Sequence, residues 1–328
     1  MLSAFSVLLT LNACNDNHFE ADISDVKAEI SIHRFDLEIR EFTPENSKEM
    51  IQEFQEKYGI FYDIFNRKIL QLGTPENPTY APDFHNFVMY NEAEGIFEAC
   101  DETFGDFSKQ KKQLTKLFRH YKYYFPKDTL PEIITFMSGF NHSAVTVDNY
   151  LAFALDKYLG SDSPFYSGAD RYLRKRMDKA YIPTDAAGAW AEQKYPKIFD
   201  NPTLFQEMIH KGKTQYFIHS MLPEYPDTLH WIYTAKQLDW AERNEANIWN
   251  HLAEDKLLFS TDRMTIRQYT ETAPFTIPLS DVSAPRAAVY VGYKIVLSYM
   301  KNNPQISLKT LMEEEDYQKI LSSANYHP

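Results

Sequence analysis

Apolar residues recur at helical spacing through most of the chain. The helical pattern runs from about residue 45 to 125 and returns after residue 157, where prolines separate its segments. Residues 284–303 are apolar nearly all round, with Lys294 in the middle and Pro304 directly after them. A short apolar run with a central lysine is typical of a buried core helix, not of a membrane span, so we predict a core helix here.

Strand patterns occupy a smaller part of the sequence. Residues 29–35 alternate between polar and apolar, and residues 132–138, 143–147 and 150–156 are short β-branched and aromatic runs separated by turn residues. We predict an antiparallel meander of about three strands, joined by the strand near residue 30. The expected fold class is α+β, a mostly helical domain around a small antiparallel sheet of three to four strands, with a two-domain division near residue 128 as the alternative.

The first residues have the pattern of a targeting signal. An apolar run over residues 2–11 is too short to cross a membrane but suits a signal peptide, and it ends in the sequence LNAC at Cys14. This ending is similar to the lipobox of bacterial lipoproteins, which implies cleavage before Cys14 and a lipid on its sulfur. We therefore expect a signal peptide over 1–13, a polar tether over 14–28 and a single domain over 29–328. The alternative for the first residues is a short buried helix.

Composition and charge exclude several classes of function. Asp and Glu number 46 against 34 Lys and Arg, a net charge of -12, and this field repels phosphate backbones, so no nucleic-acid partner is expected. The chain has only two cysteines, too few for a disulfide framework, and Cys100 lies in a helical pattern where a buried thiol is expected. Neither a glycine-rich phosphate loop nor a GxSxG elbow is present, so nucleotide cofactors and that class of hydrolase have no support.

One predicted helix partly matches a zinc-binding motif. In residues 204–224, His210 stands where an HExxH motif would begin, but Lys211 replaces the glutamate and Thr214 the second histidine. A catalytic zinc helix needs two imidazoles one turn apart and a carboxylate, and Lys211 and Lys213 place positive charge where the metal would lie. We therefore expect no metal on this helix, and no cofactor.

The next predicted helix, residues 238–260, carries a carboxylate on its apolar stripe. Glu245 shares the face of apolar residues, and a carboxylate facing a core needs a partner, for which Lys213 or His210 are the candidates. His210, Lys213, Glu242 and Glu245 are thus candidates for a vestigial pocket. The alternative for Glu245 is a structural ion pair.

A second candidate site is a ligand-binding groove. Aromatic residues make up 15% of the chain, and Tyr158, Asp162 and Tyr166 lie close together in the segment YLGSDSPFY. Such residues can line a groove for a glycan or a peptide. Aromatic side chains at this density also fill cores, which is the alternative.

Several motifs occur in one order in the carboxy-terminal third. They are HKGKTQYF (210–217), WAERNEANIW (240–249), KLLFSTD (256–262), APFT (273–276), SAPRAAVYVGYKIVLSYMKNNPQISLKTLME (283–313) and ILSSANYHP (320–328). Together with YLGSDSPFY (158–166), YIPTDAAGAWAEQKYP (181–196) and IHRFD (32–36), this series closely resembles the GldB family of Bacteroidetes lipoproteins associated with gliding motility. The resemblance covers nearly the whole mature chain.

The resemblance implies a function as well as a fold. GldB proteins are similar to predicted zinc peptidases, so it implies a metallopeptidase-like scaffold on which the changes at Lys211 and Thr214 have removed the chemistry. The expected protein is a lipid-anchored envelope protein, facing the periplasm, that acts without catalysis as a binding or assembly factor for motility or secretion machinery and so contacts other envelope proteins. The alternatives are a residual metallopeptidase-like hydrolase and a glycan- or peptide-binding lipoprotein.

Overall fold

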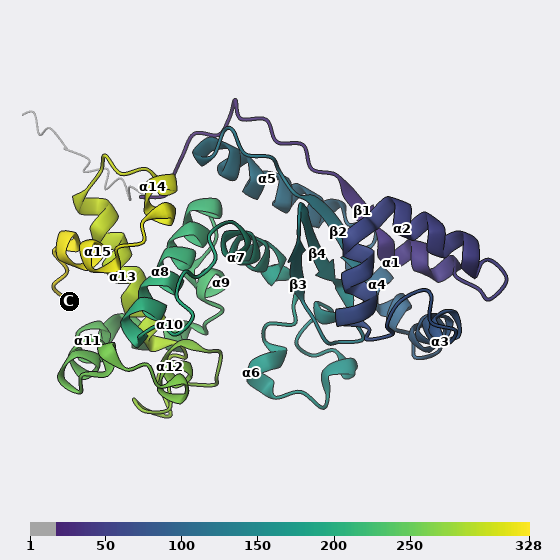
Figure 1. Ribbon diagram of the computed structural model, residues 1–328. Coiled ribbons are helices and arrows are strands. Elements are labelled where there is room, and N and C mark those ends of the chain that lie inside the picture. The colour runs from purple at the N-terminus through teal and green to yellow at the C-terminus, as the bar shows by residue number, and fades with distance from the viewer. Residues whose placement is uncertain (1–17) are drawn as a thin grey trace, which may run out of the picture.

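The computed structural model describes residues 18–328 and has the predicted α+β class (Figure 1). Each of the four segments with a strand pattern contains a strand. They are β1 (Ile32–Arg34), β2 (Glu132–Phe136), β3 (Ala144–Val147) and β4 (Tyr150–Ala154), and they form one sheet in the order β1-β2-β4-β3.

The sheet is mixed, so the prediction of an antiparallel meander is wrong for two of its pairings. β1 and β2 pair in parallel, as do β2 and β4, and only β3 and β4 are antiparallel. The connectivity explains this difference. A tight turn at Asp148-Asn149 joins β3 to β4, whereas a long helical excursion separates β1 from β2, and such crossovers connect parallel strands.

Helices make up most of the described chain. Those before β2 are α1 (Phe35–Glu38), α2 (Ser47–Ile64), α3 (Tyr80–Ala93), α4 (Ile96–Phe104) and α5 (Ser108–Tyr124). Those after β4 are α6 (Arg171–Arg174), α7 (Ile182–Lys194), α8 (Leu204–Met221), α9 (Asp227–Trp231), α10 (Ala235–Arg243), α11 (Glu245–Glu254), α12 (Arg263–Thr270), α13 (Ala287–Asn302), α14 (Leu308–Glu313) and α15 (Tyr317–Ala324). In Figure 1, α7 lies between the sheet and α8, and α13 lies beyond α8.

The helices α8 and α13 form the centre of the carboxy-terminal half, and two glycines let them touch. A Cβ atom on Gly292 would lie 2.0 Å from the carbonyl oxygen of Met208, and one on Gly212 would lie 2.5 Å from the carbonyl carbon of Gly292. Because neither residue has a side chain, the two backbones meet directly. As predicted from its pattern, α13 is a core helix, with eleven buried residues.

The start of α8 has a local explanation in the sequence. The Thr203 side chain accepts a hydrogen bond from the Gln206 backbone, and the Gln206 side chain accepts one from the Thr203 backbone. This capping box satisfies two of the amide groups that a helix leaves without partners at its first turn. The helix that carries the candidate motif is thus fixed at its beginning.

The segment expected to be a tether lies against the domain from His18 onward. Nε2 of His18 lies 2.8 Å from the Tyr216 hydroxyl, and the Phe19 ring is buried against Tyr216. The guanidinium of Arg119 on α5 donates hydrogen bonds to the carbonyl oxygens of Ile23, Ser24 and Val26. Residues 18–26 are therefore held to the rest of the protein, while Cys14 and the expected signal peptide lie outside the described residues.

Buried residues from Phe19 to Ala324 belong to a single hydrophobic cluster that includes side chains of the sheet and of both sets of helices. Cys100 belongs to it, and burial raises the pKa of its thiol far above the usual range, as suits a side chain that acts as a small hydrophobe. Among the described residues, no helix combines the length and apolar character that a membrane span requires.

Candidate functional site

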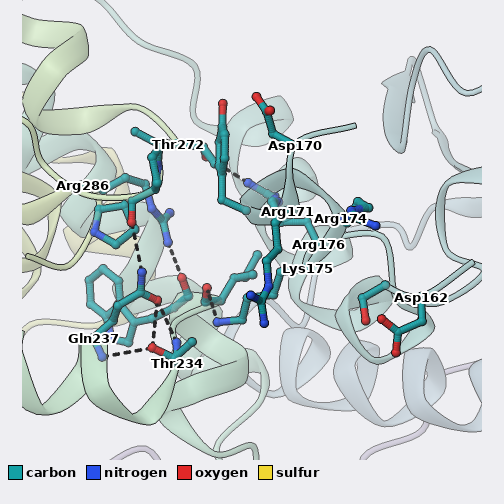
Figure 2. Close-up of a pocket in the computed structure, with 17 residues that line it drawn as sticks. Asp162, Asp170, Arg171, Arg174, Lys175, Arg176, Thr234, Gln237, Thr272 and Arg286 are labelled. Carbon is teal, nitrogen blue, oxygen red and sulfur yellow. Dashed lines mark hydrogen bonds between the residues drawn. The ribbon is translucent and has the colours of Figure 1, made fainter. Parts of the chain in front are cut away.

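A large hollow of the described chain is a cleft beside α6 (Figure 2). It encloses about 890 Å³ between residues 161–176, which include α6, and the segments around α9, the start of α10 and residues 272–286. A second hollow of about 340 Å³ adjoins it and shares Arg176, Thr272 and Arg286 as lining residues. The second hollow continues to Ser143 and Ala144 at the edge strand β3, so the two form one elongated cleft.

Cations dominate the larger hollow although the chain as a whole is acidic. Five positively charged side chains line it against two carboxylates: Arg171, Arg174, Lys175, Arg176 and Arg286 against Asp162 and Asp170. In Figure 2 they come from opposite sides, because four of the cations belong to the α6 segment and Arg286 comes from the start of α13. Packing like charges into one hollow favours an anionic ligand there.

Arg286 lines the cleft from a strained backbone conformation. Its φ is +56°, in the left-handed region that a residue with a side chain rarely adopts, and it stands directly before the first residue of α13. Its guanidinium donates a hydrogen bond to the carbonyl oxygen of Trp231 and lies 5.8 Å from the ring centres of both Trp231 and Tyr233. The aromatic wall thus holds the cation in place, and such strain concentrates at functional sites.

Lys175 reaches the same wall from the opposite side. Its Nζ donates a hydrogen bond of 3.0 Å to the carbonyl oxygen of Ile232, a β-branched residue whose φ is also positive, at +57°. Burial and the charge of Arg286 lower the pKa of Lys175 to about 8. Its positive charge is therefore sensitive to pH just above neutrality.

Only part of this charge is balanced within the protein. Arg176 forms an ion pair with Asp185 at 3.0 Å. Lys175 and Arg286 have no carboxylate within ion-pair distance among residues 18–328, and the buried Nε of Arg174 has no hydrogen-bond partner there. Half-buried cations without counter-ions lose part of their hydration, so an anion in this hollow would offset that loss.

Two of the three positions of the partial zinc motif on α8, Lys211 and Thr214, line the second hollow, whereas His210 does not. Lys211 and Gln215, one turn apart, line the second hollow, and Nζ of Lys211 lies 2.6 Å from a carboxylate oxygen of Glu271. His210 is buried elsewhere, with its Nδ1 3.3 Å from the Tyr317 hydroxyl and its Nε2 3.4 Å from Glu192. The cleft side of α8 therefore presents a lysine in an ion pair.

Lys213 lies near His210 in a smaller hollow beside the carboxy-terminal segment. Its Nζ donates a hydrogen bond of 2.7 Å to the carbonyl oxygen of Glu314 and lies 5.1 Å from the centre of the Tyr317 ring. Burial lowers the pKa of Lys213 to about 8. This lysine and His210 are thus neighbours, as the sequence motif suggested, but in a place separate from the cleft.

The two glutamates of the proposed vestigial pocket are not brought to His210. The helix expected over 238–260 breaks at Asn244, so Glu245 is the first residue of α11 and Glu242 is exposed on α10. Glu245 pairs with Lys294 at 3.2 Å and accepts a hydrogen bond of 3.0 Å from the Tyr326 hydroxyl. Its partner is therefore Lys294 of α13, not Lys213 or His210, and the structural ion pair describes it better than a pocket carboxylate does.

The predicted groove residues divide between core and surface. Tyr158 and Tyr166 are only 0% and 3% exposed, and their hydroxyls donate hydrogen bonds to Asp185 and to the carbonyl oxygen of Asp156. Both rings are thus part of the core, and neither offers a surface to a ligand. Asp162 is exposed and lies on the lining of the cationic cleft.

The residues that define the cleft were missed because their sequence signals are weak. The run RYLRKR (171–176) holds four of the cations and could have been found as a local basic cluster. Arg286 stands alone in an apolar segment, and nothing in its neighbourhood indicates that its backbone turns it into the same hollow. Only the folded chain shows that these two regions meet.

The comparisons with known proteins place the chain in a family. The model of the gliding motility protein GldB family matches residues 16–328, so the chain belongs to that family. Membership associates it with gliding motility and, by the family's designation, with the lipoproteins of the cell envelope. The chain has no match among the curated proteins or the solved structures.

Proposed function

We propose that this protein is a lipid-anchored, non-catalytic binding factor of the cell envelope that holds an extended acidic segment of another envelope protein in the cationic cleft. The observation that carries the proposal is the pair Arg286 and Lys175, two half-buried cations without carboxylate partners among the described residues. A ligand carboxylate at this place would supply the missing charge and form charge-assisted hydrogen bonds.

The shape of the cleft supports a peptide as the ligand. Its far end reaches Ser143 and Ala144 at the edge of the sheet, where an extended chain can bond to the outer side of a strand. The exposed Pro274 and the half-buried Ile232 add apolar surface at the cationic end. This combination suits a peptide with acidic side chains or a terminal carboxylate.

A lysine on the side of α8 that faces the cleft supports a non-catalytic role. Lys211 occupies it with an ammonium group that Glu271 binds at 2.6 Å and Glu207 approaches at 3.5 Å. A second cation, as a metal ion would be, is electrostatically disfavoured beside this lysine. The part of the helix that resembles a peptidase motif is thus suited to structure and not to metal-assisted hydrolysis.

Binding of labelled peptides to the purified soluble chain tests the proposal. A short oligo-glutamate peptide should bind, an oligo-lysine peptide should not, and the affinity should fall as salt is added. Changing Arg171→Glu together with Arg174→Glu should weaken oligo-glutamate binding at least tenfold, because it reverses two charges at the mouth of the cleft. Fluorescence polarisation measures both effects.

A matched double variant separates the cleft from general electrostatics. Lys109→Glu with Lys112→Glu makes the same change of net charge on the exposed face of α5 and should leave binding nearly unchanged. Equal loss in both double variants, or no binding of oligo-glutamate by the unaltered chain, would overturn the assignment. Crosslinking in isolated envelopes, followed by capture of this protein, then identifies the partner in the unaltered strain and its loss in the cleft variant.

A further inference from the structure

Two buried histidines and an aspartate meet where α8 turns into α9. Nε2 of His219 lies 3.5 Å, and Nδ1 of His230 lies 3.3 Å, from the same carboxylate oxygen of Asp227. The three ligand atoms all lie within 4.8 Å of one another, and the two imidazole rings are 4.0 Å apart. Both histidines are buried, while the Asp227 side chain is 54% exposed.

Backbone carbonyls decide which nitrogen of each ring carries the proton. Nδ1 of His219 lies 2.8 Å from the carbonyl oxygen of Gln215, and Nε2 of His230 lies 2.9 Å from that of Leu222. A carbonyl oxygen only accepts, so each of these nitrogens must donate its N–H. In the neutral rings the remaining nitrogens, the ones that face Asp227, therefore present lone pairs.

This arrangement leaves three electron-pair donors directed at one place. A carboxylate oxygen and two imidazole lone pairs repel one another unless a cation lies between them. Protons on both rings are one solution, but two charged rings 4.0 Å apart would repel each other. The contacts of 3.3 and 3.5 Å are also long for charge-assisted hydrogen bonds, which are usually about 2.7–2.9 Å.

The two distances to Asp227, 3.5 and 3.3 Å, match edges of a metal coordination polyhedron. Zinc binds histidine nitrogen and carboxylate oxygen at about 2.0–2.2 Å, so neighbouring ligand atoms in a tetrahedral site lie about 3.3–3.6 Å apart. The hydrogen bonds to the Gln215 and Leu222 carbonyls are those that metal-binding histidines use to fix their orientation. Unlike the partial motif at His210, this group thus has both the ligands and their supporting contacts.

We propose that His219, Asp227 and His230 form a binding site for a divalent transition metal ion, zinc first, with the fourth coordination position open on the exposed side of Asp227. The ion would tie the end of α8 to α9. It would thereby hold Trp231 and Ile232, whose carbonyl oxygens bind Arg286 and Lys175, in the wall of the cationic cleft.

Metal binding by the purified chain, prepared without a histidine tag and stripped with a chelator, tests the proposal directly. We expect one zinc ion per chain by elemental analysis after dialysis, and the strong visible absorption of a four-coordinate site when cobalt replaces zinc. Asp227→Asn keeps the size of an exposed side chain but removes its charge, and it should weaken zinc binding at least tenfold. Zinc should raise the melting temperature of the unaltered chain more than that of the variant.

Controls separate this site from adventitious binding. Asp255→Asn, which alters an exposed aspartate paired with His251 at 3.1 Å, should leave zinc affinity and the cobalt spectrum unchanged. His230→Gln should abolish the spectrum, and circular dichroism shows whether that variant is folded. Zinc content no higher than background, or equal affinity in Asp227→Asn and Asp255→Asn, would overturn the proposal. Because none of these measurements involves a peptide, failure here leaves the proposed function of the cleft to be judged separately.

Discussion

At the scale of single residues, ligand binding in the cleft depends on the positions of a few cations and on their protonation. Burial lowers the pKa of the Arg286 guanidinium, but an arginine still keeps its charge at neutral pH. Lys175 loses its charge just above neutrality, since burial and the neighbouring Arg286 lower its pKa to about 8. Ile232 and Arg286 both have strained backbone conformations. The carbonyl oxygens of Ile232 and Trp231 accept the hydrogen bonds that position Lys175 and Arg286. The charge of the site can therefore be changed by pH without changing the fold.

Binding of the oligo-glutamate peptide should weaken as the pH rises from 7 to 9. Lys175 is a cation below its pKa of about 8 and neutral above it, so one charge is lost across this range, and we expect roughly a tenfold fall in affinity. Lys175→Arg keeps the charge and should give a nearly flat profile when the dissociation constant is measured against pH. Parallel declines in the unaltered chain and the variant would show that Lys175 is not the titrating group.

At the scale of elements, the contact between α8 and α13 determines the shape of the carboxy-terminal half. Gly212 and Gly292 allow the two backbones to touch, and α13 begins at the residue after Arg286, so the crossing also positions this cation. The chain has only ten glycines, and two of them serve this contact. A side chain at either position would push the two helices apart.

Replacing Gly292 by Ala should therefore destabilise the protein by roughly 3 kcal/mol, because the added Cβ would lie 2.0 Å from the Met208 carbonyl oxygen. Alanine favours a helix over glycine by about 1 kcal/mol, so the loss must come from the clash. Gly168→Ala is the control, since nothing lies within 4 Å of its Cβ position and its φ is not in the left-handed region. Urea denaturation measures both, and a midpoint for Gly292→Ala equal to that of the unaltered chain would contradict the close crossing.

At the scale of the whole molecule, the described chain is a domain onto which its first described residues fold back. His18 and Phe19 pack on α8, and Arg119 holds the segment that follows them. If the lipid is attached at Cys14, only a short stretch separates it from the folded domain. The domain would then remain close to the membrane surface.

Changing Cys14 to Ser should remove the lipid and release the protein from the membrane. Incorporation of labelled fatty acid should be lost, and the protein should move from the membrane fraction to the soluble fraction, because several acyl chains are needed for durable anchoring. Cys100→Ser is the matched control, since the Cys100 thiol is buried in the core and its replacement should leave the labelling unchanged. A Cys14→Ser protein that still sediments with membranes would indicate a different means of attachment.

The local patterns of the sequence determined the elements and the family. Strand segments, the core helix α13 and the burial of Cys100 could be read from periodicity and composition, because these depend on neighbours along the chain. The series of motifs also identified the GldB family, which the match over residues 16–328 confirms. The partners of Glu245 and His210 could not be read in this way, since each pairs with a residue from a distant helix.

Only the tertiary structure decided the order of the strands and the composition of both candidate sites. The sheet places β4 between β2 and β3, and the cleft joins Lys175 to Arg286, although no local signal connects them. His219 and His230 looked like scattered residues in the sequence, and the turn from α8 to α9 brings them to one carboxylate. The physical reason is common to these cases: periodicity reports which side of an element is buried, whereas a site forms where separate elements converge.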